Sequence, residues 1–349
     1  MSIVEHLADL TGHRDRDALD VTLVSAMRDL LRPKSVAIFR CVGEPGSQRW
    51  LSRAKLGLND VLPSADPLWA DVETLPRLED HAARCESFRR QSTVLVSGMP
   101  YLTVFCLANE RETVGVLEVE SDDALDANAQ RLVGCILRIY RNFQGVLDDS
   151  ERDSLTGLLN RKTFDTSFLK AIAEAANDAP APAAEALSAT QADRRAAPAG
   201  PNYRVGLIDI DHFKRVNDSH GHLIGDEVLL LLSRLMRSCF RFHDRLYRFG
   251  GEEFVVLMRS ESDRDAAVAF ERFRRMTENY AFPQVGRITV SIGFTEVLAG
   301  DAPSGAFERA DRAVYFAKAH GRNRVHCFGD LVARGELKDN ANVGDVELF

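Results

Sequence analysis

The stretch Tyr247-Arg-Phe-Gly-Gly-Glu-Glu-Phe-Val-Val-Leu257 has the pattern of a strand, a tight turn and a second strand. Gly250 and Gly251 supply the backbone angles that a two-residue hairpin turn requires, because glycine adopts positive φ without steric cost. The turn would present Glu252 and Glu253 at one end of a sheet. The stretch therefore predicts an antiparallel hairpin with an acidic tip inside an α/β unit.

A second apolar run, Tyr203-Arg-Val-Gly-Leu-Ile-Asp-Ile-Asp211, predicts a strand that ends in aspartates. Beside the hairpin, it would bring Asp209 to the same corner as Glu252 and Glu253. Three converging carboxylates repel one another unless a cation lies between them, and Mg²⁺ prefers a few carboxylates together with phosphate oxygens. Such a metal can activate a hydroxyl and stabilise charge on a transferring phosphoryl group. A bare Gly-Gly-Glu-Glu turn is more often a generic acidic hairpin, so the interpretation depends on the surrounding motifs.

Residues 153–328 resemble the GGDEF-type diguanylate cyclase domain along their whole length. Five segments in the order of that family carry the resemblance: Asp153–Arg161, Asp209–Asp226, Gly250–Phe254 in its Gly-Gly-Glu-Glu-Phe form, Ile288–Gly293 and Ala310–Arg324. The resemblance implies an α/β (α+β) fold related to the palm of polymerases and to class III nucleotide cyclases. It also implies that two GTP molecules are condensed into cyclic di-GMP.

By position, the resemblance assigns the metal to Asp209, the carbonyl of Ile210 and Glu252, with Mg²⁺ as the expected cation and Mn²⁺ as its alternative. Glu253 would help to deprotonate the attacking 3′-hydroxyl. The expected catalytic residues are therefore Glu253, Glu252 and Asp209.

The resemblance also implies that Asn217 and Asp226 bind guanine. A carboxylate can accept from both the N1–H and the 2-amino group of guanine, which adenine does not offer together. The other expected substrate-binding residues are Lys214, Lys318 and Arg322, whose charges would neutralise the triphosphate, together with Phe213 and His222. Without the resemblance, each of these basic residues would more readily be a solvated surface charge.

Arg241-Phe-His-Asp244 has the RxxD pattern at the offset where the family's inhibitory product site lies. Arg241 would stack on or clamp guanine and phosphate, and Asp244 would accept from a guanine edge. These two residues predict inhibition by cyclic di-GMP.

The implied reaction needs two GTP molecules that face each other, and one domain resembles half of such a site. Catalysis is therefore expected in a homodimer. One alternative is a catalytically silent receptor for cyclic di-GMP or GTP. Others are a nucleotidyl cyclase of different specificity and a partner-binding scaffold whose output is the enzyme.

Thr113-Val-Gly-Val-Leu-Glu-Val-Glu-Ser121, followed by the helix from Leu125, resembles the last strand and exit helix of a GAF domain. Residues 1–124 are therefore expected to form a GAF-like sensor sheet. GAF domains often bind a small molecule but many serve as dimer scaffolds, and no residue here marks a ligand. A helix is predicted over residues 17–31, and strands over 35–42, 102–108 and 113–119. Residues 125–152 repeat apolar side chains at helical spacing, which predicts a linking helix. Its stripe either packs on its own domain or forms a dimerising signalling coil, and its position between two domains favours the second.

The bulk composition limits the remaining classes of function. The chain has 349 residues and a formal net charge of −8, which argues against nucleic-acid binding. Its six cysteines are scattered, which argues against a zinc site and favours a reducing compartment. Neither a signal peptide nor a membrane span is expected, so the predicted location is cytoplasmic. The Ala/Pro-biased residues 178–200 are expected to form a flexible insertion, and residues 329–349 a polar C-terminal tail.

Overall fold

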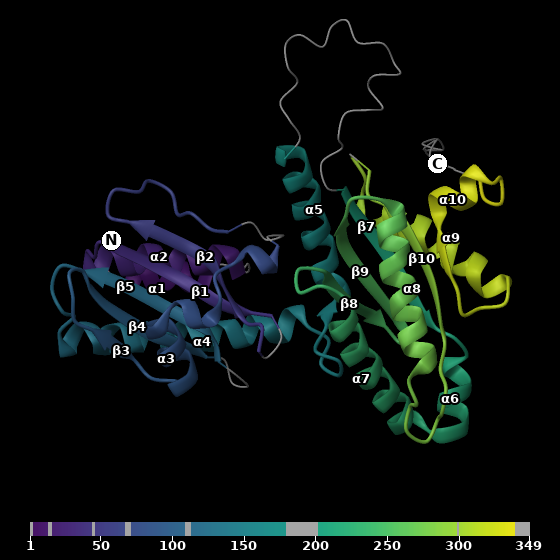
Figure 1. Ribbon diagram of the computed structural model, residues 1–349, viewed down its shortest axis with the longest axis horizontal. Coiled ribbons are helices and arrows are strands. Elements are labelled where there is room, and N and C mark those ends of the chain that lie inside the picture. Colours follow the sequence, from purple (N-terminus) through teal and green to yellow (C-terminus); the bar gives the residue numbers. More distant parts are fainter. Residues whose placement is uncertain are drawn as a thin grey trace, which may run out of the picture. The chain divides into compact units, whose positions relative to one another are not determined.

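The computed structural model describes residues 3–12, 16–43, 46–66, 71–108, 113–178, 202–298 and 300–338, and of residues 3, 174–178 and 202 only the backbone. The chain divides into two compact units, residues 1–150 and 151–349 (Figure 1). Apart from residue 178, the predicted insertion 178–200 lies outside the described residues.

The first unit is built on a five-stranded antiparallel sheet in the order β2-β1-β5-β4-β3. Its strands are β1 (Ser35–Val42), β2 (Arg49–Gly57), β3 (Val94–Val96), β4 (Tyr101–Ala108) and β5 (Thr113–Ser121), and its helices are α1 (Ile3–Gly12), α2 (Arg16–Leu31), α3 (Ala82–Arg90) and α4 (Ala127–Glu151). The predicted helix over 17–31 and the three predicted strands are confirmed as α2, β1, β4 and β5.

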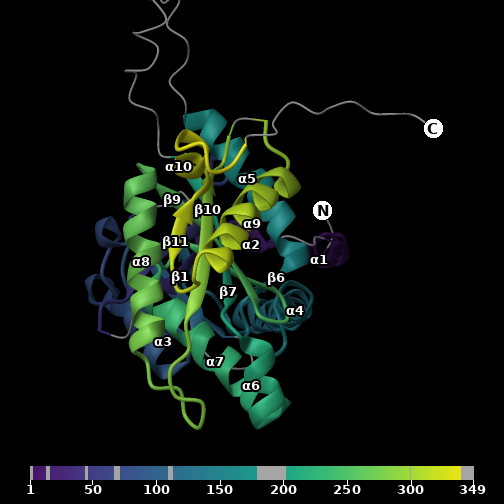
Figure 2. The ribbon, with the colours of Figure 1, turned by 90° about the vertical axis from the view of Figure 1, so that its right-hand side faces the viewer.

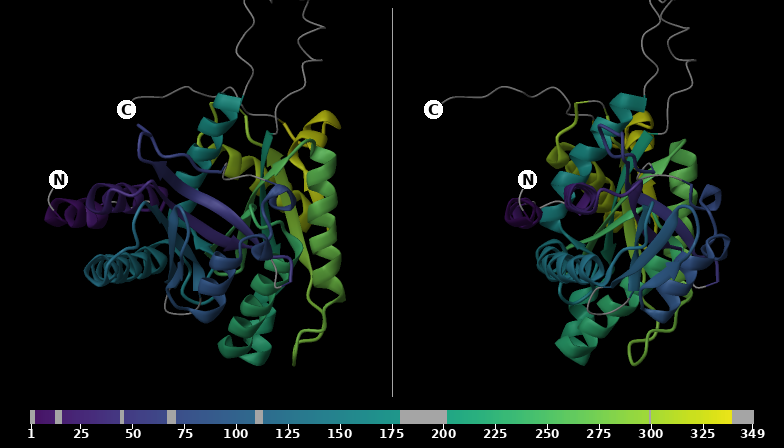
Figure 3. Two further views of the ribbon diagram at one scale, coloured as in Figure 1. Left: turned by 60° about the vertical axis from the view of Figure 1, so that its left-hand side comes forward. Right: turned by 90° about the vertical axis from the view of Figure 1, so that its left-hand side faces the viewer.

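The two faces of this sheet are covered by different helices. In β1, Val36 and Ile38 pack in a core shared with α2 and α4, whereas Ala37 and Phe39 pack in a second core that contains Cys85 of α3. Alternate side chains of a strand point to opposite faces, which explains the separation. Figure 3 shows the purple α1 and α2 together with the teal α4 on one side of the sheet.

The predicted linking helix forms as α4, and half of its apolar stripe is buried within the first unit. Val133, Ile136, Tyr140 and Leu147 are all at most 3% exposed and belong to the core shared with α2. These four side chains therefore pack on their own domain, whereas Val146 of the same stripe is 61% exposed. A dimerising role of the helix stays a prediction. The periodicity of an apolar stripe cannot by itself distinguish a helix that packs on its own domain from one that forms a dimer seam. No helix among the described residues is sufficiently long and apolar to span a bilayer.

The second unit has a six-stranded sheet in the order β11-β10-β7-β9-β8-β6. Its strands are β6 (Leu159–Asn160), β7 (Asn202–Ile210), β8 (Arg245–Gly250), β9 (Glu253–Ser260), β10 (Val290–Glu296) and β11 (Val325–Cys327), and its helices are α5 (Arg161–Asp178), α6 (Phe213–His220), α7 (His222–Cys239), α8 (Asp263–Asn279), α9 (Pro303–Ala319) and α10 (Phe328–Ala333). The central strands pair antiparallel, while β11 and β6 run parallel to their neighbours.

Two glycines allow helices to approach the centre of this sheet closely. A Cβ at Gly206 of β7 would lie 2.1 Å from the ring of Phe270 in α8. A Cβ at Gly293 of β10 would lie 2.3 Å from the carbonyl oxygen of Ala310 in α9. Gly206 pairs with Phe294, the residue after Gly293, so the two close approaches come from opposite faces. Figure 2 shows α8 and α9 on the two sides of the sheet.

The start of the predicted C-terminal tail is part of the fold, which corrects the expected boundary at residue 329. Phe328 and Leu331 of α10 are 3% and 1% exposed and pack against Ala313 of α9. Two apolar residues spaced for one helical face are too short a signal for a helix to be predicted. Residues 339–349 lie outside the described residues.

Candidate active site

The acidic corner forms at the ends of β7 and β9. Asp209 is paired with Glu253 in the antiparallel register, and the backbone N–H of Ile210 donates to the carbonyl of Glu252 over 3.4 Å. The turn between β8 and β9 uses φ values of 145° at Gly250 and 49° at the next residue, Gly251. The backbone thus brings the three predicted carboxylates to one edge of the sheet.

Asp209 has the most constrained environment of these acids. It is 5% exposed, its Oδ2 lies 2.7 Å from Nζ of Lys318, and its buried Oδ1 has no hydrogen-bond partner among the described residues. Burial raises the pKa of Asp209 above its ordinary value, Lys318 opposes the rise, and Glu253 adds to it. Burial also raises the pKa of Glu252, with a further contribution from Asp209. The corner therefore has an excess of negative charge that a bound cation would relieve.

The acidic corner has the few protein ligands that are typical of a Mg²⁺ site, rather than a complete set of ligands supplied by the protein. Among the residues that the structure describes, no three His, Cys, Asp or Glu side chains are grouped as a metal site. The predicted ligand set needs only two side chains, Asp209 and Glu252, together with the carbonyl of Ile210. Mg²⁺ commonly binds through one or two carboxylates and keeps waters or substrate phosphates as its other ligands. The orphaned Oδ1 of Asp209 supports a cation at this position.

The β8–β9 hairpin is held by a contact with Asp153, the first residue of the segment Asp153–Arg161. This contact was not predicted from the sequence. Arg248 donates from Nε and Nη2 to the carbonyl of Gly251 over 3.2 and 3.0 Å, and from Nη1 to Oδ1 of Asp153 over 3.0 Å. Asp153 also accepts from the backbone and the hydroxyl of Thr156. These hydrogen bonds and Arg248 lower the pKa of Asp153 against the opposing effect of burial, the largest single influence on it. The side chain of Arg248 thus fixes the turn that carries Glu252.

Asn217, one of the two predicted guanine-binding residues, is seated between α6 and α7. A Cβ at Gly225 would lie 1.9 Å from Oδ1 of Asn217 and 3.3 Å from the ring of Phe213, so the glycine makes room for the amide. Asp226 follows Gly225 and is exposed in the first turns of α7. Phe213 is 5% exposed and belongs to the hydrophobic core, so it supports α6 from below. The two other predicted residues of this segment, which are both exposed, are Lys214 and His222.

Two of the three predicted phosphate-binding residues, Lys318 and Arg322, lie at the end of α9 and in the turn after it, whereas Lys214 is on α6. Lys318 contacts Asp209, so in this structure its charge compensates the acidic corner. Arg322 follows α9 in a turn and has a φ of 61°. The backbone N–H of Arg322 donates to the carbonyl of Ala317 over 2.9 Å. This hydrogen bond closes the turn and keeps Arg322 close to Lys318 in the chain's path.

The RxxD segment forms a tight turn. The backbone N–H of Arg241 donates to Oδ2 of Asp244 over 2.8 Å, and the N–H of Asp244 returns a hydrogen bond to the carbonyl of Arg241 over 3.0 Å. Burial raises the pKa of Asp244 to about 6, while Arg241 and Arg272 oppose the rise. Arg272 of α8 donates to the carbonyl of Cys239 over 2.7 Å. It is far from Asp244 in the sequence, so only the packing of α7 against α8 reveals that it adds positive charge here.

Comparisons with known proteins agree with the motifs of this unit. Residues 185–324 match the family described as diguanylate cyclase, GGDEF domain. Diguanylate cyclase VdcA of Vibrio cholerae is 33% identical over 196 residues, which are 54% of this chain and 50% of that protein. Diguanylate cyclase DgcZ of Escherichia coli is 35% identical over 179 residues, which are 50% of this chain and 52% of that protein.

A solved structure is also similar. The coiled coil and GGDEF domain of DgcB from Caulobacter crescentus, in complex with c-di-GMP, is 28% identical with a TM-score of 0.47 and covers 59% of this chain and 100% of that one. The chain spans about half the length of the two curated relatives named above. At residues 185–324 the chain therefore contains a GGDEF domain of the diguanylate cyclase type.

Proposed function

We propose that the chain is a diguanylate cyclase that condenses two GTP molecules into cyclic di-GMP. The observation that carries the proposal is the corner of Asp209, Glu252 and Glu253, where burial and mutual repulsion raise the pKa values of Asp209 and Glu252. The similarity to curated diguanylate cyclases at 33% and 35% identity supports the same conclusion.

In the proposed reaction, Asp209, Glu252 and the carbonyl of Ile210 would hold Mg²⁺. Its charge would supply electrostatic stabilisation of the α-phosphate and a lower pKa for the attacking hydroxyl. Glu253, opposite Asp209 in the register, takes the proton of the 3′-hydroxyl. Lys318 and Arg322 neutralise the triphosphate, and pyrophosphate leaves as the 3′-oxygen bonds to the α-phosphorus.

Two catalytic units must face each other, because each 3′-oxygen attacks the partner's nucleotide. A homodimer would supply the two half-sites and hold the reacting atoms in line. Val133, Ile136, Tyr140 and Leu147 of α4 belong to the core of the first unit, so the dimer would use other side chains.

The decisive experiment is product identification. Purified protein is incubated with GTP, with ATP and with both, each with Mg²⁺, and the nucleotides are separated and identified by mass. Cyclic di-GMP formed from GTP alone supports the proposal. A mixed dinucleotide would establish a different specificity. A folded protein that binds cyclic di-GMP but makes no product would instead be a silent receptor.

We expect Gly225→Ala to raise the KM for GTP about tenfold. The added methyl group would lie 1.9 Å from Oδ1 of Asn217 and would displace the amide from its seat. Loss of one guanine hydrogen bond corresponds to about 1–2 kcal/mol, or roughly a tenfold change in affinity. Steady-state kinetics and thermal unfolding measure the effect and the fold. Gly305→Ala is the control, because its Cβ meets nothing within 4 Å, and an unchanged KM in Gly225→Ala would refute the role of this seat.

We also propose that Arg241 and Asp244 form an inhibitory site for the product. Arg241→Ala is expected to weaken inhibition by cyclic di-GMP at least tenfold, because a guanidinium in contact with guanine or phosphate is lost. The two hydrogen bonds of the turn use the backbone of Arg241, so the substitution keeps both of them. Initial rates across a series of product concentrations give the inhibition constant. The same constant in the variant and in the unmodified chain would exclude the site.

The first unit is proposed to be a GAF-like sensor, on the basis of its antiparallel sheet with helices on both faces.

All six cysteines are free thiols, which supports a reducing cytoplasmic location.

A further inference from the structure

The turn after α9 holds an unfavourable backbone conformation. Gly321, Arg322 and Asn323 have φ values of 110°, 61° and 46°. A non-glycine residue in the left-handed region is uncommon, and such residues persist when surrounding contacts determine them. Two of them in succession therefore need specific contacts to hold the turn.

One set of contacts comes from the end of β7. Asp211 is 6% exposed, and its Oδ2 accepts from the backbone N–H of Asn323 over 3.0 Å and from the hydroxyl of Thr289 over 2.7 Å. Its Oδ1 accepts from the hydroxyl of Ser291 over 2.7 Å. Asp211 directly follows β7 and lies two residues after Asp209, so this carboxylate ties the turn to the strand that carries Asp209.

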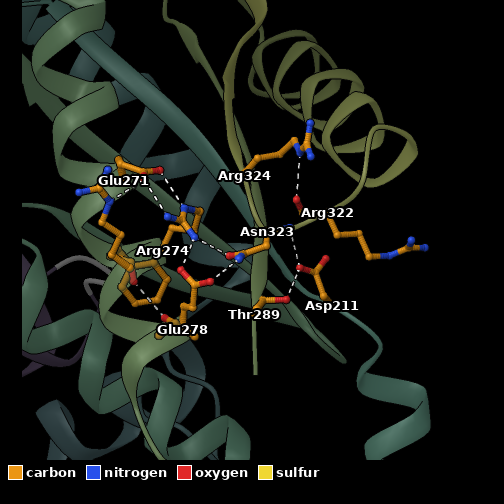
Figure 4. Close-up of polar contacts among 11 residues, drawn as sticks. Asp211, Glu271, Arg274, Glu278, Thr289, Arg322, Asn323 and Arg324 are labelled. Carbon is orange, nitrogen blue, oxygen red and sulfur yellow. Dashed lines mark hydrogen bonds and ion pairs between the residues drawn. The ribbon is translucent and has the colours of Figure 1, made fainter. Parts of the chain in front are cut away.

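The second set comes from α8. Nη1 of Arg274 donates to Oδ1 of Asn323 over 2.6 Å and to Oε2 of Glu278 over 2.8 Å. Nδ2 of Asn323 donates to Oε1 of Glu278 over 2.8 Å, which closes a ring of three side chains. The remaining nitrogens of Arg274 bond to both carboxylate oxygens of Glu271. Figure 4 shows this cluster on one side of the turn, with Arg322 extending away from it.

The ring of side chains holds the side chain of Asn323 by hydrogen bonds, and Asp211 holds its backbone N–H. Together these contacts restrict the backbone conformation of the preceding residue, Arg322. Within the described part of the chain, the guanidinium of Arg322 has no hydrogen-bond or ion-pair partner that could hold it, whereas Arg324 donates to the carbonyl of Arg322 over 2.9 Å. The backbone of the turn therefore sets the point and the direction at which the Arg322 side chain leaves the chain.

We propose that Arg274 and Glu278 are positioning residues that aim Arg322 at the β- and γ-phosphates of GTP. The inference rests on the proposed function, because it takes Arg322 as a ligand of the triphosphate. It assigns a role in substrate binding to two residues of α8 that contact neither the nucleotide nor the acidic corner. A preformed turn removes the cost of ordering the backbone at Arg322 at the moment of binding.

The test compares two nucleotides that differ in the phosphates that Arg322 would reach. Arg274→Ala is expected to weaken binding of the non-reactive α,β-methylene analogue of GTP about tenfold, with GMP affinity unchanged within twofold. Arg275→Ala is the matched control, because Arg275 is its neighbour on α8, is exposed and, among the described residues, pairs with Glu271 alone. Calorimetry on the full-length chain measures both affinities. An equal loss for both nucleotides, or no loss for either, would overturn the proposal.

A double substitution tests the route of the effect. If Arg274 acts through Arg322, then adding Arg274→Ala to Arg322→Ala causes no further loss of analogue affinity. A further tenfold loss would mean that Arg274 acts elsewhere and would refute the positioning role. Glu278→Gln gives a graded check, since the amide oxygen can still accept from Asn323 while the charge that pairs with Arg274 is gone, so we expect a loss of about threefold.

These measurements also separate this proposal from the proposed function. Binding is read without turnover, so a chain that makes no cyclic di-GMP but shows the nucleotide-dependent loss would keep the positioning role and lose the activity. An unmodified chain that forms cyclic di-GMP but shows no difference between Arg274→Ala and Arg275→Ala would keep the activity and lose the positioning role.

Discussion

Replacing Glu253 by Gln is expected to lower kcat about 10³-fold while the affinity for GTP stays within twofold. Glu253 lies opposite Asp209 in the strand register, at the corner where the attacking hydroxyl would bind. The amide keeps the shape of the carboxylate but cannot accept the proton, and loss of general-base catalysis typically costs about 10²–10⁴ in rate. A thousandfold change corresponds to about 4 kcal/mol of transition-state stabilisation.

Single-turnover rates and equilibrium binding of GTP are the measurements, and Glu261→Gln is the control. Glu261 follows the opposite end of β9 and is exposed, so its substitution leaves the corner unchanged. Near-normal turnover by Glu253→Gln would show that another group, or solvent, takes the proton. An equal fall in kcat and in GTP affinity would show that Glu253 binds the substrate instead.

The acidic hairpin could be predicted from the sequence because its determinants are local. Gly250 and Gly251 fix the turn, apolar runs flank it, and the run that begins at Tyr203 ends in the required aspartate. β2 could not be predicted, because Arg49, Arg53 and other polar side chains interrupt its apolar pattern.

The contacts that hold the site residues in place could not be predicted, because the residues that make them are distant from one another in the chain. Asp211, Arg274 and Asn323 meet only when β7, α8 and the turn after α9 are packed together. Each of them is an unremarkable polar residue in its own segment. Sequence patterns therefore reported the residues proposed to touch the substrate, whereas the contacts that hold Arg322 and Arg248 in place required the structure.

Asp209→Asn is expected to abolish stabilisation of the protein by Mg²⁺ and to lower turnover at least 10²-fold. Asp209 is buried, and its Oδ1 lacks a partner among the described residues, so a metal is the group that best completes it. A ligand at one hundred times its dissociation constant stabilises a fold by about 2.7 kcal/mol. The unmodified chain should therefore unfold at a higher temperature with Mg²⁺, and the variant should not respond.

The pH dependence of this stabilisation gives the prediction a second readout. The pKa values of Asp209 and Glu252 are raised in the folded chain, chiefly by burial. In the absence of metal, ionising these groups therefore opposes folding, and protons relieve the repulsion as the pH falls through the raised pKa values. Protons and Mg²⁺ then compete for the same oxygens, so the metal-induced rise in unfolding temperature should shrink as the pH falls. Asp218→Asn, an exposed change on α6, should retain the full Mg²⁺ response, and a full response in Asp209→Asn would place the metal elsewhere.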